Sequence, residues 1–201
     1  MASPFVGGWN RIKRAARFLR AHPRWAIEFV EQDRQPVLKM SADSDWAGNP
    51  LTRKSVSCCH AMLGRHLIKS YVGSHSAPAL SSGEAEFVAQ VKSGSIALGI
   101  QSLAKDLGEE VSLELGADSS AAKGVLGRLG LGKIRHLETG SLWILHFVDR
   151  GVFKLGKACG SRENSADVGT KDLNEGDMRR CLELVRVVEL SGSHSLALQI
   201  E

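Results

Sequence analysis

The sequence predicts an α/β domain in which helices pack on the faces of a mixed β-sheet. Two observations predict this class. The expected elements follow the order strands, helix, strand, helices, strand, helix, and their apolar residues alternate in the strand segments but recur at helical spacing elsewhere. With 201 residues, the chain is long enough for one domain with extensions and a buried core.

The first third of the chain is predicted to contain one helix and four strands. Residues 9–21 carry apolar side chains at helical spacing with arginines between them, and His22-Pro23 ends this helix. Four β-type runs separated by turn sequences are then expected to form an antiparallel meander: Trp25–Val30, Val37–Ala42, Ser55–Leu63 and His66–Val72.

A long helix is predicted in the middle of the chain. Ser81 and Glu84 form a capping box at its start, and the apolar-rich segment runs to Leu107, with Gly108 just beyond. The alternating pattern of Val111–Ala117 then predicts a strand. The remaining expected elements are a helix capped by Ser119 or Ser120 and running to Leu126, a helix over about Leu137–Val148, a strand over Val152–Ala158, a helix opened by Asn164 or Ser165, a helix over Glu175–Val188 and a flexible tail.

The composition is that of a globular protein, with 43% hydrophobic and 24% charged residues. The net charge is +4, and arginines and lysines crowd the first stretch, which weakly favours a polyanionic partner. No apolar run approaches the ~20 residues of a membrane span, and the start lacks a secretory signal. We therefore expect an intracellular protein of the cytoplasm or nucleus with no membrane partner. The four cysteines form no CxxC pair, so reduced thiols are expected.

Four short acidic patches are the best indication of function. They are Asp43 in ADSDWAGN, Glu86 in SSGEAEF, Asp118 in ELGADSSAA and Asp167 in ENSADVGT. A carboxylate beside small residues at a strand end or helix start can approach a divalent cation, and several converging carboxylates can hold two. On composition and spacing alone, however, the better-supported interpretation is that they are ordinary surface acids that cap helices or form ion pairs.

Two of the patches contain a second acid. Glu84 is assigned to the capping box, whereas Glu86 begins a stripe of small side chains that would let the helix approach a sheet closely. In the first patch, Asp43 ends the apolar strand and Asp45 begins the turn. We favour Glu86 and Asp43, with Asp45 as the alternative.

Five blocks in one order carry a family resemblance: ADSDWAGNPLTRKS, ALSSGEAEFVA, ADSSAAKGV, KIRHLET and ENSADVGTKDL. They resemble the ribonuclease H domain of copia-type LTR retrotransposon Pol polyproteins, which lies C-terminal to reverse transcriptase. The match runs from about Val37 to Leu173. It implies a ribonuclease H-like fold, with a mixed five-stranded sheet and helices on both faces. The implied regions are a connection to reverse transcriptase (1–35), the ribonuclease H-like domain (36–175) and a C-terminal helix with a tail (176–201).

The resemblance also implies an activity, namely metal-dependent endonucleolytic hydrolysis of the RNA strand of RNA–DNA hybrids. Its catalytic and metal-binding residues would be Asp43, Glu86, Asp118 and Asp167, holding two Mg²⁺ ions for which Mn²⁺ can substitute. The implied partners are the hybrid and an adjacent reverse transcriptase domain. The candidate nucleic-acid contacts are Ser119, Ser120, Lys133, Arg135 and Lys171. For these residues, a role as solvated surface side chains is at least as well supported.

Some positions depart from the family pattern. The loop Ala158–Arg162 lacks the histidine that cellular ribonucleases H often carry there. Val56, Cys58 and Cys59 stand where the family pattern leads us to expect Thr, Gly and a small or β-type residue, and Tyr71 stands where Trp is usual. The alternative function is therefore a catalytically decayed or domesticated ribonuclease H-like module that binds nucleic acid or has a structural role.

Overall fold

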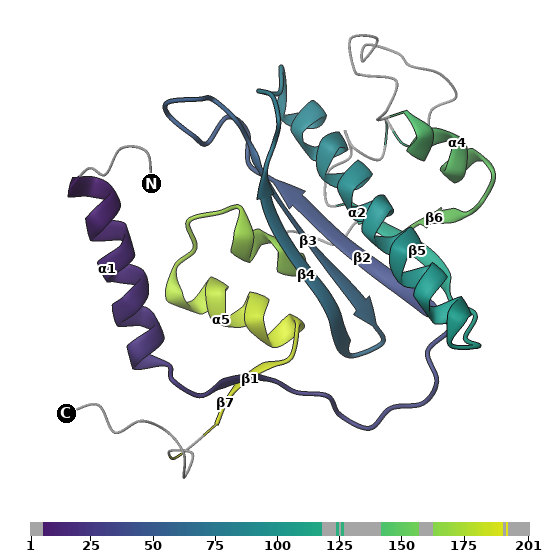
Figure 1. The fold of residues 1–201 in the computed structure, drawn as a ribbon, viewed down its shortest axis with the longest axis horizontal. Helices are drawn as coiled ribbons and strands as arrows, with labels where there is room; N and C mark the ends of the chain where they lie inside the picture. Colours follow the sequence, from purple (N-terminus) through teal and green to yellow (C-terminus); the bar gives the residue numbers. More distant parts are fainter. Residues whose placement is uncertain are drawn as a thin grey trace. The chain divides into compact units, whose positions relative to one another are not determined.

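The computed structural model describes residues 6–117, 124, 126, 142–156, 163–190 and 192. The chain divides into two compact units (Figure 1). The larger unit is Phe29–Arg186, and the smaller unit joins Met1–Glu28 to Val187–Glu201. The larger unit contains the central sheet and the acidic patches.

The central sheet has five strands in the order β4-β3-β2-β5-β6. β2 pairs antiparallel with β3 and parallel with β5, while β3 and β4 are antiparallel and β5 and β6 are parallel. The predicted mixed five-stranded sheet is therefore confirmed. The strands are β2 (Val37–Ser44), β3 (Val56–Leu63), β4 (His66–Ser74), β5 (Ser112–Ala117) and β6 (Phe153–Leu155).

The long helix α2 (Ser82–Asp106) begins at the predicted cap. The backbone N–H of Glu84 donates to the Ser81 hydroxyl over 3.2 Å, and the Glu84 carboxylate accepts from the backbone N–H of Leu80 over 2.9 Å. Glu84 is thus used at the helix start, as the sequence predicts. The predicted stripe of small side chains is buried against the sheet, where α2 contacts β2, β3 and β5: Ala89, Ser93 and Ala97.

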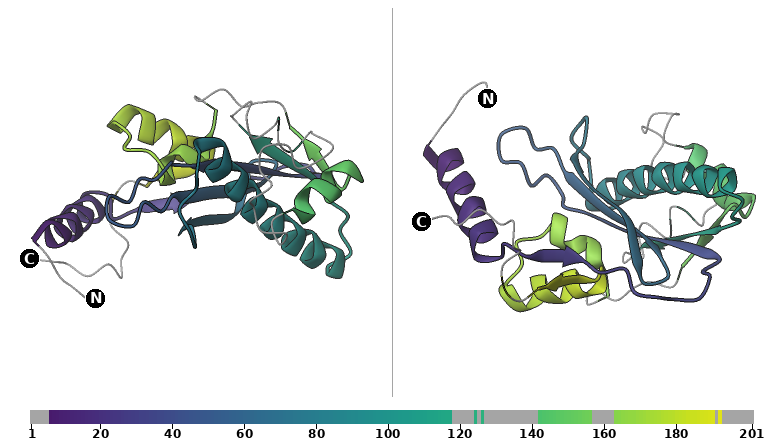
Figure 2. Two further views of the ribbon diagram at one scale, coloured as in Figure 1. Left: turned by 90° about the horizontal axis from the view of Figure 1, so that it is seen from above. Right: turned by 60° about the horizontal axis from the view of Figure 1, so that its bottom comes forward.

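Helices and turns cover both faces of the sheet (Figure 2). Ala42 and Cys59 pack with Ala89 of α2 on one face. Because neighbouring residues of a strand point to opposite faces, Asp43 and Cys58 face the other side. The 3₁₀ helix η2 (Ser165–Gly169) and helix α5 (Glu175–Leu184) lie there, with η2 against β2 and β3 and α5 against η2.

The hydrophobic core lies between the sheet and α2, with α4 (Trp143–Asp149) beside β6. Gly94 of α2 marks a close approach, because a Cβ there would lie 3.0 Å from Ile144 Cδ1. The largest fully buried apolar side chains of this core are Leu38, Met40, Phe87, Leu113, Leu115, Ile144 and Phe153. No helix in the described ranges combines the length and the apolar character needed to cross a membrane.

Two sequence expectations are wrong, one of them in the smaller unit. The smaller unit contains α1 (Val6–Ala21), β1 (Trp25–Ile27) and β7 (Val187–Glu189), and β1 pairs antiparallel with β7. The strand predicted over Trp25–Val30 is therefore shorter and is not part of the meander. The helix predicted over Glu175–Val188 ends at Leu184, because Arg186 adopts a φ of 60° that breaks the helical path before β7.

Several expected elements reach beyond the described residues. The helix running to Leu126 falls almost entirely outside them, although Leu126 itself is buried in the core. The helix expected over Leu137–Val148 is described from Trp143 onward. The strand expected over Val152–Ala158 is described as Phe153–Leu155.

Replacing Phe87 in α2 should destabilise the larger unit. Its side chain is completely buried in the core, so Phe87→Ala should lower the free energy of unfolding by about 3–5 kcal/mol. Leu103→Ala is a matched control, because Leu103 lies on the same helix but is 59% exposed. Its effect should stay within about 0.5 kcal/mol. Urea unfolding followed by circular dichroism compares the two, and similar losses would contradict the described packing of α2.

Candidate active site

Asp43 lies near the carboxyl end of the central strand β2, and its side chain is only 5% exposed. The Thr170 hydroxyl donates a hydrogen bond to Asp43 Oδ2. Asp45 has a different environment, since its Oδ1 accepts from the backbone N–H of Val56 over 2.5 Å. Asp45 thus supports the turn, whereas Asp43 faces the segment that carries the last acidic patch.

Asp167 is brought to the sheet by η2. The side chain of Asn164, the N-cap of η2, donates to the backbone carbonyl of Ala42 over 3.3 Å, next to Asp43. Ser165 Oγ and His60 Nδ1 form a 2.8 Å hydrogen bond that joins η2 to β3. Two buried hydrogen bonds therefore hold the start of η2 on the strands.

Gly169 lets the end of η2 approach the same face. A Cβ at this position would lie 2.7 Å from both Cβ and Sγ of Cys58, and 3.0 Å from Cγ2 of Val72. Any side chain larger than hydrogen would force η2 away from β3. The close approach brings the following residues, Thr170 and Lys171, to the carboxylate of Asp43.

Lys171 joins Asp43 and Asp167. Its ammonium lies 2.7 Å from Asp167 Oδ1 and 3.6 Å from Asp43 Oδ1. The structure therefore brings together three of the predicted residues, Asp43, Asp167 and Lys171. Lys171 was expected to contact nucleic acid, and its side chain is 42% exposed.

Glu86 lies in the second turn of α2 and is partly buried. It precedes by three residues Ala89, which packs with Ala42, the neighbour of Asp43 in β2. Figure 1 shows the start of α2 and the carboxyl end of β2 at the same end of the sheet. Glu86 is therefore at the same end of the sheet as Asp43, but the described residues do not group it with Asp43 and Asp167 in a cluster that could hold a metal ion.

The remaining predicted site residues lie outside the described residues. β5 ends at Ala117, which pairs with Ala42, and Asp118 is the next residue in the sequence. Four predicted contacts to nucleic acid also lie outside the described residues and stay predictions: Ser119, Ser120, Lys133 and Arg135.

Comparisons with known proteins bear on the fold and the relatives of this chain. No family model matches the chain. Over 187 residues, the chain is 27% identical to the retrovirus-related Pol polyprotein from transposon TNT 1-94 of Nicotiana tabacum. The matched region covers 92% of this chain and 14% of the polyprotein. The chain thus spans about one seventh of the length of that relative. The expected resemblance to retrotransposon Pol polyproteins is confirmed.

The structure of LC11 ribonuclease H1, isolated from compost, superposes with a TM-score of 0.51 at 14% identity, covering 66% of this chain and 91% of that chain. This chain has the ribonuclease H fold. The N-terminal ribonuclease H domain of rv2228c from Mycobacterium tuberculosis is a more distant neighbour, with a TM-score of 0.44 at 13% identity, covering 74% of this chain and 98% of that chain.

In this ribonuclease H fold, the acids lie beside a buried cysteine and histidine. Burial, together with the nearby Cys59, Asp43 and Asp167, raises the pKa of Cys58 to about 12, against a smaller opposing effect of a hydrogen bond to the backbone of Gly169. Burial lowers the pKa of His60 from its usual 6.5 to about 4. Both side chains are therefore neutral near pH 7, so the carboxylates are the hard, charged ligands on this face.

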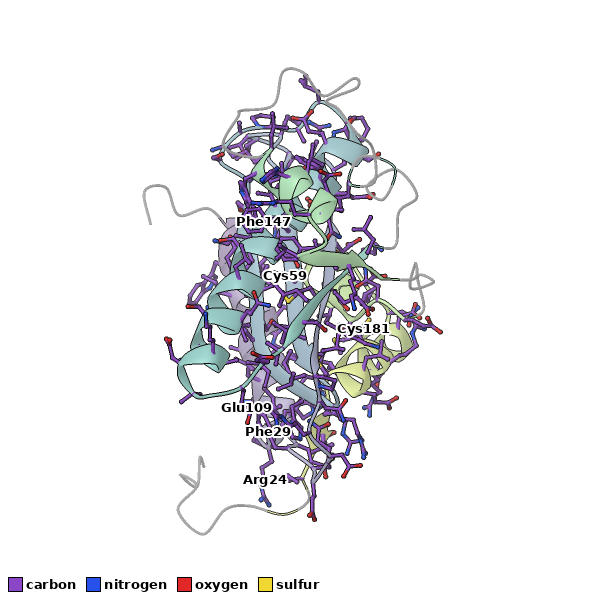
Figure 3. The ribbon with its side chains drawn as sticks, turned by 90° about the vertical axis from the view of Figure 1, so that its right-hand side faces the viewer. Arg24, Phe29, Cys59, Glu109, Phe147 and Cys181 are labelled. Atoms are coloured by element: carbon purple, nitrogen blue, oxygen red, sulfur yellow. The ribbon has the colours of Figure 1, made fainter. Side chains whose placement is uncertain are left out.

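The described cysteines do not form a soft-metal site. Cys58, Cys59 and Cys181 are free and buried, and Figure 3 shows Cys59 in the sheet well separated from Cys181 in α5. Within the described ranges, no three or more His, Cys, Asp or Glu side chains are grouped to hold a metal ion. Asp118, which the family resemblance adds to the acids, falls outside those ranges.

Two residues of the site were not found from the sequence. Thr170 and His60 act through contacts with distant residues, Asp43 and Ser165, so no local pattern signals them. For Lys171 a local signal exists, because it follows Asp167 by four residues, the spacing of ion pairs on a helical turn.

Stability should depend on pH through His60. Its pKa is about 4 in the folded chain and about 6.5 in the unfolded chain, so between these values only the unfolded chain binds the proton. The stabilising effect of the neutral imidazole is complete above pH 6.5 and is lost as the pH falls toward 4. The free energy of unfolding should fall by on the order of 3 kcal/mol over this window.

His60→Gln provides the comparison, because glutamine does not titrate in this range. Urea unfolding at pH 7 and pH 4.5 should show a clearly smaller pH effect in the variant. Part of the effect should remain, since burial also lowers the pKa of His75, against smaller opposing influences of Asp45 and Glu84. An identical pH dependence in both proteins would contradict the assignment to His60.

Proposed function

We propose that this chain is a metal-dependent endonuclease that hydrolyses the RNA strand of RNA–DNA hybrids. The observation that carries the proposal is the meeting of Asp43 and Asp167 at one cation, at the end of the central strand of a ribonuclease H fold. These two acids are far apart in the sequence and are brought together by the fold. The similarity to a Pol polyprotein supports a retrotransposon origin.

The donor set fits a divalent cation. Asp43 and Asp167 present hard carboxylate oxygens from nearly buried positions, and an ammonium already lies between them. Glu86 and Asp118 would complete the set, with two Mg²⁺ ions bound and Mn²⁺ able to replace them. When bound, such ions supply an activated water and neutralise the charge that develops on the phosphate.

The residues of this chain then have distinct tasks. Thr170 holds one carboxylate oxygen of Asp43 through its hydroxyl hydrogen bond, which fixes the orientation of that carboxylate. Asn164 and Ser165 keep η2, and with it Asp167, on the strands. The site is thus pre-organised before substrate binds, which is the condition for efficient positioning of a reacting phosphate.

A hybrid substrate would be recognised by shape and backbone rather than by base edges, since the 2′-hydroxyl and the A-like minor groove distinguish RNA. Candidate contacts are Ser119, Ser120, Lys133, Arg135 and Lys171. An adjacent reverse transcriptase domain is the proposed partner in the longer polyprotein, because the matched relative is a Pol polyprotein several times longer than this chain.

Asp43→Asn should slow cleavage strongly while keeping the fold. Substituting even a partner of a metal ligand costs about 10–100-fold in activity or metal affinity, so loss of a ligand should slow cleavage by more than about a hundredfold. The measurement is cleavage of a hybrid labelled on its RNA strand, with Mg²⁺, Mn²⁺ or EDTA. EDTA should stop cleavage by the unmodified protein.

Asp106→Asn is the matched control. Asp106 is an exposed aspartate at the far end of α2, and its substitution should leave the rate unchanged. Equal cleavage by the Asp43 variant would place the chemistry elsewhere. Binding of the hybrid by the unmodified protein without any metal-dependent cleavage would instead favour the decayed or domesticated binding module.

A further inference from the structure

The ammonium of Lys171 pairs with both Asp43 and Asp167. It is 2.7 Å from Asp167 Oδ1 and 3.6 Å from Asp43 Oδ1. The side chains of Asp43 and Asp167 are 5% and 6% exposed, whereas that of Lys171 is 42% exposed. The partly exposed side chain of Lys171 therefore pairs with two nearly buried carboxylates.

This ion pair differs from an ordinary surface pair at the same spacing. Arg179 and Glu175 are also four residues apart, but their side chains are 53% and 76% exposed. Both charges of that pair are solvated, so it contributes little. Asp43 and Asp167 have lost most of their water, and their mutual repulsion requires a positive charge nearby.

Lys171 provides only part of that charge. The three side chains of Asp43, Asp167 and Lys171 together carry a net negative charge if both acids are ionised, because a single ammonium pairs with two carboxylates. The Thr170 hydroxyl adds a hydrogen bond to Asp43 but no charge. A divalent cation would complete the neutralisation, but it would have to approach oxygens that the ammonium already contacts.

We propose that Lys171 is an internal counter-ion of the acidic site, which a divalent cation displaces on binding. The inference rests on the proposed function, because it concerns the same metal ions. In the metal-free chain the ammonium holds the two carboxylates together. When the metal binds, the flexible four-carbon stem of Lys171 swings toward solvent, since the ammonium and the metal ion repel each other. Lys171 thus weakens metal affinity while it stabilises the metal-free site.

The test measures metal binding rather than activity. Isothermal titration of the full chain with Mn²⁺ compares the unmodified protein with Lys171→Met and Lys171→Arg. Lys171→Met should bind Mn²⁺ about tenfold to a hundredfold more tightly, the range expected when one competing charge-assisted hydrogen bond is removed. Its melting temperature in EDTA should fall, because the two carboxylates lose their counter-ion.

Two controls isolate the effect. Lys171→Arg keeps the positive charge and should bind Mn²⁺ no more tightly than the unmodified protein. Lys105→Met removes an exposed lysine from the last turn of α2, away from the acids, and should leave Mn²⁺ affinity unchanged. Unchanged or weaker binding by Lys171→Met, with normal binding by the unmodified protein, would overturn the inference and leave the proposed function intact.

A second measurement needs no variant. In the unmodified protein, ¹⁵N NMR of the lysine ammonium groups should show the Lys171 signal in a hydrogen-bonded ion pair in EDTA and released on addition of saturating Mg²⁺. A Lys171 signal that saturating Mg²⁺ leaves unaltered would overturn the inference. If no Mn²⁺ or Mg²⁺ binds to any of these proteins, the proposed metal-dependent function fails, and the inference fails with it.

Discussion

The docking of η2 on β2 and β3 is the constraint on which the candidate site depends. Asp43 and Asp167 are far apart in the sequence, and they meet because Asn164 binds the Ala42 carbonyl and Gly169 packs directly on Cys58. A side chain at Gly169 or a missing hydrogen bond at Asn164 would leave both acids in place on their own elements but would separate them. The chemistry of the site is therefore a consequence of the packing of one short helical segment.

The same packing explains how two carboxylates coexist with so little solvent. The chain directly after η2 supplies the Thr170 hydroxyl and the Lys171 ammonium, so the segment that brings one acid to the sheet also carries the groups that stabilise the pair. Cys58 is notable because the family pattern leads us to expect a glycine at this position. Its side chain is accommodated because the facing residue of η2 is itself a glycine, so this departure is compatible with an intact site.

Much of this architecture could be predicted from the sequence, because the signals are local. The alternating runs that form β2, β3, β4 and β5, and the Ser81 cap of α2, depend on neighbouring residues. The pairing of β1 with β7 could not be predicted, since it joins the two ends of the chain. In the site, an acid can be recognised by its motif, but the contacts of Thr170 and His60 depend on how η2 docks. Only tertiary structure provides that information.

The most direct test of a shared site is a crystal structure of the chain with Mn²⁺ and an RNA–DNA hybrid, in which an anomalous difference map locates the manganese. The account predicts an anomalous peak within coordination distance of carboxylate oxygens of both Asp43 and Asp167, beside a phosphate of the RNA strand. Manganese bound elsewhere, or bound to neither carboxylate, would contradict it.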